Sequence, residues 1–65
     1  MSTYRIVRMF QNPFLHTRVI KRGLTLEEAQ RWCRDPETSS RTATSTNARQ
    51  RTMAYGAWFD GYEEE

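Results

Sequence analysis

Cysteine and histidine are almost absent from this sequence, which contains only Cys33 and His16. A lone cysteine cannot form an internal disulfide, and one cysteine with one histidine cannot supply the ligands of a structural zinc site. A chain of 65 residues allows one domain, and a domain of this size buries only about 60% of its unfolded surface. We therefore expect a single domain over residues 1–65 that needs no metal and no cofactor. Its stability must rest on the packing of its aromatic side chains or on a partner subunit.

Long apolar runs are also missing. No run approaches the roughly 18 residues that a membrane-spanning helix requires. The N-terminal residues, MSTYRIVRMF, show neither the apolar core nor the small-residue cleavage site of a signal peptide. The sequence therefore predicts no membrane association, a cytoplasmic location and a reduced Cys33 thiol.

Each end of the chain lacks charge of one sign, although the net charge is only +2. Residues 1–26 contain no acid, and residues 60–65 contain no base. The bases of the first segment are Arg5, Arg8, Arg18, Lys21 and Arg22, and the acids of the last are Asp60, Glu63, Glu64 and Glu65. Either the two ends lie close together and neutralise each other, or the basic segment is free to meet phosphates or an acidic protein.

Two short runs near the N-terminus predict an antiparallel β-hairpin. Residues 4–10, YRIVRMF, and residues 18–22, RVIKR, are rich in β-branched and aromatic residues, and Asn12-Pro13 between them is a turn signal. Alternation places Arg5 and Arg8 on opposite faces of the first strand but does not show which face is buried. Phe14 and Leu15 lie in the connecting loop, where apolar residues are uncommon, so they either fold back onto the core or face a partner.

A capping box predicts a helix over residues 25–34. Thr25 fits the N-cap position, Glu28 follows three residues later, and Asp35-Pro36 ends the helix. One face of this helix should pack on the hairpin through Leu26, Ala29, Trp32 and Cys33.

The rest of the chain is less regular. Residues 37–46 are dominated by serine and threonine and fit either an extended segment or a loop held by hydroxyl groups. A short helix over 48–55, ending at Gly56, could be capped by Ser45, Thr46 or Asn47. On this helix Ala48, Thr52 and Tyr55 would share one side, with Arg49, Gln50 and Arg51 exposed. Residues 57–62 predict a third strand that returns to the hairpin, which gives an α+β fold.

Three segments, GLTLEEAQ at 23–30, DPETSS at 35–40 and WFDGYEEE at 58–65, together resemble a family of small uncharacterised proteins of tailed bacteriophages that infect mainly actinobacteria. The resemblance covers nearly the whole chain. It implies a phage-encoded protein acting in the host cytoplasm, and it implies no activity and no site residues.

No catalytic constellation is visible. Cys33 and His16 are the only possible nucleophile and base, but Cys33 falls on the apolar face of a predicted helix, where cysteine usually acts as a small hydrophobe. The acids cluster at a helix start and in a tail, where capping and solvation explain them. A serine- or threonine-capped helix near residue 45 could favour an anion, but the segment lacks the glycines and lysine of a P-loop. We therefore expect a protein that is not an enzyme.

Two binding functions remain, and the first is favoured. The chain could bind a host or phage protein, or a second copy of itself, through apolar residues in unusual places: Phe14, Leu15 and Tyr62. It could instead bind nucleic acid through the basic hairpin residues Arg5, Arg8, Arg18, Lys21 and Arg22, with bases stacking on Tyr4, Phe10 or Phe14. Trp58 and Phe59 are either core residues or part of an aromatic anchor beside the acidic tail.

Overall fold

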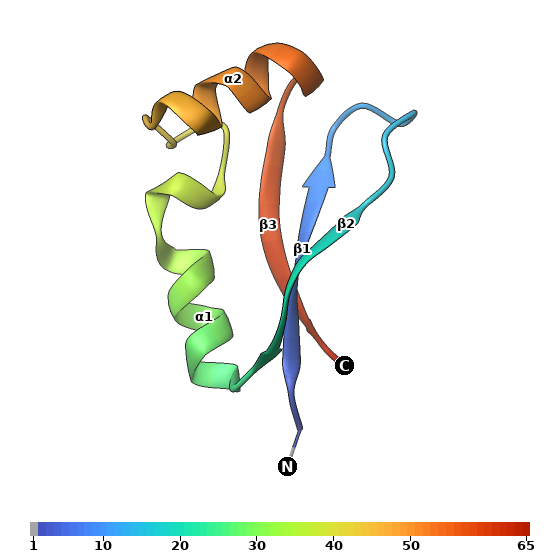
Figure 1. The fold of residues 1–65 in the computed structure, drawn as a ribbon, viewed down its shortest axis with the longest axis vertical. Helices are drawn as coiled ribbons and strands as arrows, with labels where there is room; N and C mark the ends of the chain where they lie inside the picture. Colours follow the sequence, from blue (N-terminus) through green and yellow to red (C-terminus); the bar gives the residue numbers. More distant parts are fainter. Residues whose placement is uncertain (1) are drawn as a thin grey trace.

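A computed structural model describes residues 2–65 and shows an α+β fold. A three-stranded antiparallel sheet is covered on one side by two helices, α1 and α2 (Figure 1). The elements are β1 (Tyr4–Phe10), β2 (Arg18–Leu24), α1 (Leu26–Arg34), the short 3-10 helix η1 (Pro36–Thr38), α2 (Thr46–Tyr55) and β3 (Trp58–Glu64). The start of β1 and the end of β3 lie at one end of the molecule, and α2 and the β1–β2 loop lie at the other (Figure 1).

The sheet has the strand order β2-β1-β3, so the predicted third strand does return to the hairpin. β3 pairs with β1 along its whole length, from Tyr4 opposite Glu64 to Phe10 opposite Trp58. β2 pairs less regularly, with shifts in register on both sides of Ile6. It continues to Leu24, two residues beyond the predicted end.

The helix side of the sheet carries the core. Ile6 is fully buried and packs with Leu24 and Ala29. Because strand side chains alternate, Arg8 lies on the same side as Ile6, and Arg5 lies on the opposite, open side. The alternation predicted for β1 is thus observed. The face that carries Ile6 is the one covered by the helices, which the sequence did not show.

Helix α1 begins at the predicted cap. The Thr25 hydroxyl accepts a hydrogen bond from the Glu28 backbone N–H, and the Glu28 carboxylate accepts one from the Thr25 backbone N–H. Trp32 and Cys33 pack against the core beside the buried Ala29. The prediction was wrong for Leu26, which stands in the first turn and remains 42% exposed.

The segment from 37 to 46 contains no strand: it begins in η1, ends in the first residue of α2, and is an ordered loop between them, apart from a single β-bridge between Ser39 and Phe59. Hydroxyl groups hold it, as the loop alternative required: Thr38 Oγ1 donates to the Asp35 carbonyl at 2.6 Å. Ser45, one of the three proposed caps, caps α2 by accepting from the Ala48 N–H.

Gly56 ends α2, as the sequence predicted. Its φ is +82°, a conformation that residues with a side chain rarely adopt.

Candidate functional site

The β1–β2 loop presents an exposed aromatic ring. The Phe14 backbone N–H donates to Asn12 Oδ1, and the Leu15 N–H donates to the Asn12 carbonyl, so the Asn12-Pro13 turn is fixed by local hydrogen bonds. The Phe14 side chain is 89% exposed, and Leu15 is half-buried. Of the two alternatives for these residues, Phe14 does not fold back onto the core.

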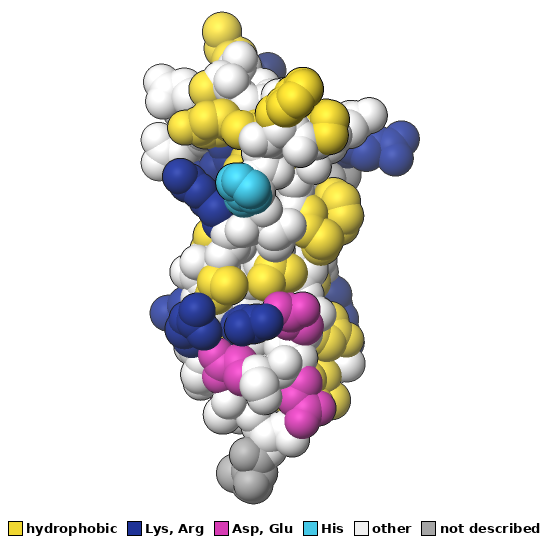
Figure 2. Space-filling view, turned by 90° about the vertical axis from the view of Figure 1, so that its right-hand side faces the viewer, with side chains coloured by type: hydrophobic (Ala, Val, Ile, Leu, Met, Phe, Trp, Pro, Cys, Tyr) yellow, Lys and Arg dark blue, Asp and Glu magenta, His cyan; other side chains and the backbone are white. Residues whose placement is uncertain are grey.

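Beside Phe14, the loop and the end of α2 enclose a shallow cavity of about 210 Å³. Its lining residues, which we call the loop-end surface, are Phe10, Phe14, Leu15, His16, Arg18 and Tyr55. Phe10 and Tyr55 contact each other edge to face, with ring centroids 5.7 Å apart. Figure 2 shows apolar side chains gathered at this end of the molecule, next to the single histidine.

Tyr62 does not belong to this surface. It lies in β3 opposite Ile6, and its ring stands edge-on to Tyr4 at 6.2 Å. Its hydroxyl accepts a hydrogen bond from Gln30 of α1. The structure therefore brings Phe14 and Leu15 together and places Tyr62, still 40% exposed, elsewhere.

The two aromatic residues at the start of β3 face opposite sides. Trp58 is 2% exposed and is part of the core, whereas Phe59 is 51% exposed on the open side of the sheet. Val19 of β2 is also exposed there, opposite the buried Val7.

The five basic residues of the hairpin do not converge on one face. Three pair with the C-terminal acids, as Arg5–Glu63, Arg8–Asp60 and Arg22–Glu65. The two ends of the chain therefore neutralise each other, which was the first of the two interpretations of the charge pattern. Within residues 2–65, Arg18 and Lys21 make no ion pair and no side-chain hydrogen bond.

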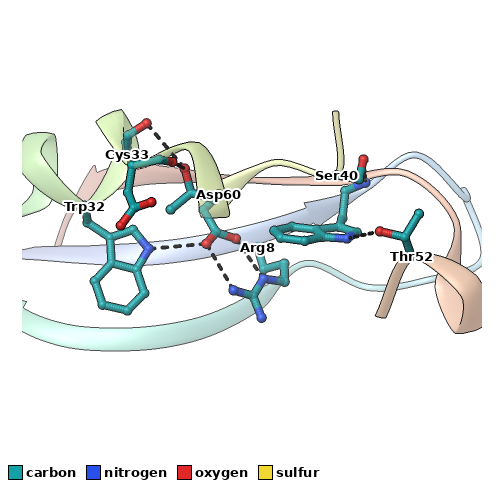
Figure 3. A network of polar contacts seen from close by, with 9 residues as sticks. Arg8, Trp32, Cys33, Ser40, Thr52 and Asp60 are labelled. Atoms are coloured by element: carbon teal, nitrogen blue, oxygen red, sulfur yellow. Dashed lines mark hydrogen bonds and ion pairs between the residues drawn. The ribbon is translucent and has the colours of Figure 1, made fainter. Parts of the chain in front are cut away.

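The pair between Arg8 and Asp60 is buried. Arg8 Nε and Nη2 donate to the two Asp60 carboxylate oxygens at 2.7 and 3.0 Å, and Trp32 Nε1 donates to one of them at 3.2 Å (Figure 3). The Asp60 side chain is 1% exposed. Bidentate, charge-assisted geometry of this kind fixes the guanidinium in place and compensates its charge.

Trp58 connects this network to α2. Its Nε1 donates to Thr52 Oγ1 at 3.0 Å. The guanidinium carbons of Arg8 and Arg51 lie 4.9 and 4.7 Å from the centroid of its ring, within the range of a cation–π interaction.

Arg51 corrects the sequence prediction for α2. It was expected to be exposed with Arg49 and Gln50, but it is half-buried against Trp58. Burial, and then the charge of Arg8, lowers the pKa of Arg51. Helical spacing could have revealed this residue, because Arg51 lies three residues after Ala48 and four before Tyr55, on the same face.

The candidate nucleophile and base lie in different surroundings. Cys33 packs against the core, and burial, together with the charge of Asp60, raises the pKa of its thiol. His16 lines the cavity of the loop-end surface.

Residues 2–65 hold no group of three or more His, Cys, Asp or Glu side chains placed to bind a metal ion. None of the helices in this range is long and apolar enough to cross a membrane.

The anion-binding position suggested near residue 45 is occupied by the chain's own carboxylate. Glu37 accepts hydrogen bonds from the backbone N–H groups of Thr44 and Ser45 at 2.7 and 3.0 Å. The Ser45 side chain, and then these two backbone N–H groups, lower the pKa of Glu37 to about 2.

No family model, no curated protein and no solved structure matches this chain.

Proposed function

We propose that this chain is a non-enzymatic bacteriophage accessory protein that binds a host or phage protein in the host cytoplasm through the loop-end surface. The observation that carries the proposal is the Phe14 side chain, 89% exposed on a loop that hydrogen bonds hold in shape. The resemblance of GLTLEEAQ, DPETSS and WFDGYEEE to small phage proteins supports the proposed phage origin and action in the host.

The surroundings of Phe14 have the composition of a protein interface. Aromatic residues and arginine are enriched at the centres of such interfaces, and the loop-end surface combines Phe10, Phe14 and Tyr55 with Arg18. Because the turn already fixes the Phe14 backbone, a partner that covers the ring has to restrict only the rotation of its side chain.

The test is capture of partners from host lysate by the purified protein. Phe14→Ala, alone and with Leu15→Ser, should reduce capture at least about fivefold, because an anchor residue contributes more than about 1 kcal/mol. Met53→Ala is the matched control, since Met53 is 87% exposed but lies outside the loop-end surface. Capture that is unchanged in the folded Phe14 variants would contradict the proposal, and analytical ultracentrifugation of the same variants tests a second copy as the partner.

Nucleic acid is the second candidate, favoured only by two basic side chains that make no ion pair within residues 2–65. Arg18 lines the cavity beside the exposed Phe14 ring, and Lys21 lies further along β2, opposite Ile6. Two such contacts predict a log-affinity slope of about −2 against log salt on duplex DNA. Capture that disappears after nuclease treatment, together with this slope, would favour nucleic acid over a protein partner.

A further inference from the structure

We infer that the loop-end surface binds a protein segment that presents a carboxylate beside an apolar side chain. This inference rests on the proposed function and specifies the chemistry of the partner. It follows from how charge is distributed around Trp58.

Three guanidinium groups approach the helix side of the sheet at this end, and only one buried carboxylate accompanies them. Arg18 lies directly opposite Arg8 in the β1–β2 pair, and Arg8 and Arg51 both lie over the Trp58 ring. Asp60 is already engaged, because both of its oxygens accept from Arg8. Asp60 therefore compensates Arg8, and Arg18, which pairs with no acid within residues 2–65, is left as a positive charge that can meet an incoming anion.

Arg51 and Arg18 are the groups that remain to bind this anion. Within the described chain Arg51 makes no hydrogen bond through its guanidinium, although it is half-buried and held against an indole. Arg18 is exposed and lines the cavity. A guanidinium held in place loses less freedom when it forms the paired hydrogen bonds that a carboxylate accepts.

The apolar wall next to these arginines favours an acidic protein segment over a polyphosphate. Arg51 and Tyr55 are neighbours on one face of α2, since they are four residues apart. Tyr55 packs on Phe10 and completes the cavity with Phe14. The cavity, at about 210 Å³, is below the roughly 300–1,000 Å³ of typical small-molecule sites and suits one side chain. An aromatic or aliphatic side chain in the cavity would place a neighbouring carboxylate near the guanidinium groups.

The probe is 3-phenylpropionate, which carries a ring and a carboxylate. The uncharged control is 3-phenylpropionamide, which has the same shape. Each is titrated into the labelled protein while the NMR signals of Trp58 Nε1–H and the arginine Nε–H groups are followed. The acid should give saturable shifts at Trp58, Arg18 and Arg51. The amide should bind at least about tenfold more weakly than the acid. Arg51→Gln and Arg18→Gln should each weaken the acid about tenfold. Arg49→Gln removes the same charge from the exposed side of α2 and should leave binding unchanged.

Two results would overturn the inference. Equal binding of acid and amide, or equal loss in the Arg49 and Arg51 variants, would show that no carboxylate is recognised at this place. Single-stranded oligonucleotide that binds through Arg18 and Arg51 and is not displaced by the acid would identify nucleic acid as the ligand instead.

Failure of the inference can be told apart from failure of the proposed function. If captured protein is lost with Phe14→Ala but retained with Arg18→Gln and Arg51→Gln, the loop-end surface binds a partner through apolar contacts alone, and only the carboxylate is refuted. If capture survives Phe14→Ala, the proposed function itself fails.

Discussion

Replacing Asp60 by asparagine should destabilise the domain severely. The change keeps the shape of the side chain but removes the charge that compensates Arg8, whose side chain is only 15% exposed. It also turns an amide N–H₂ group toward donors, because Arg8 and Trp32 together direct three hydrogen bonds at the two Asp60 oxygens. Removing one partner of a buried ion pair costs about 3–5 kcal/mol. A domain of this length has a total stability of about 3–10 kcal/mol.

Urea unfolding followed by tryptophan fluorescence measures the effect, since Trp32 and Trp58 both contact the network. Asp60→Asn should lower the free energy of unfolding by about 3 kcal/mol or more. Arg8→Met combined with Asp60→Leu should recover part of that loss, because replacing both members of a buried pair by apolar side chains is often neutral, while Trp32 Nε1–H still loses its acceptor. A loss below about 1 kcal/mol in Asp60→Asn would refute the reasoning, since it would mean that water already compensates Arg8.

Three further predictions concern other contacts. Thr25→Ala should lower the free energy of unfolding by about 0.5–2 kcal/mol, because the first turn of α1 loses its cap; an unchanged melting temperature would contradict this. Thr52→Val should cost about 1–3 kcal/mol by leaving Trp58 Nε1–H without its acceptor, whereas Thr52→Ser should restore most of it in the same urea assay. Glu37 has a pKa lowered from 4.5 to about 2, so its contribution to stability is present above pH 4.5 and is lost as the pH falls through about 2. The NMR chemical shift of the Ser45 backbone N–H should change with pH with that low midpoint, and the Glu37→Gln variant should show no such change. A midpoint near 4.5 would show that the loop bonds do not persist in solution.

Local signals in the sequence were sufficient for the three strands and for α1, but not for residues 37–46, which the sequence left open between a strand and a loop. The capping box of α1 lies within four residues, and the strands are marked by their own side chains and by the turn at Asn12-Pro13. Gly56 identified the end of α2 for the same reason, whereas the sequence left its cap open among Ser45, Thr46 and Asn47, of which the structure shows Ser45. Each of these features depends on neighbours along the chain, so a single sequence is enough to predict it.

The candidate site depends on contacts between distant segments, which local patterns do not encode. Arg51 was expected to be exposed because an arginine beside Gln50 resembles a solvated face, and its indole partner Trp58 becomes visible only when β3 is placed. Tyr62 was grouped with Phe14 because both lie in positions where apolar residues are seldom needed. The pairing of β3 with β1 separates them, because it fixes Tyr62 opposite Ile6, away from the loop.

The register between β1 and β3 also decides where positive charge is left for binding. It places Arg5 opposite Glu63 and Arg8 opposite Asp60, so pairing of the strands neutralises the basic first strand. A slip of one residue would turn every side chain of β3 to the other face and break both pairs, so burial of Trp58 and the ion pairs favour the same register. β2 is an edge strand, so Arg18 has no acidic strand on its far side. Arg18 therefore keeps its positive charge without an acidic partner within residues 2–65, and it is the cation that lines the loop-end surface, while the acidic tail is used up by the first strand and by Arg22.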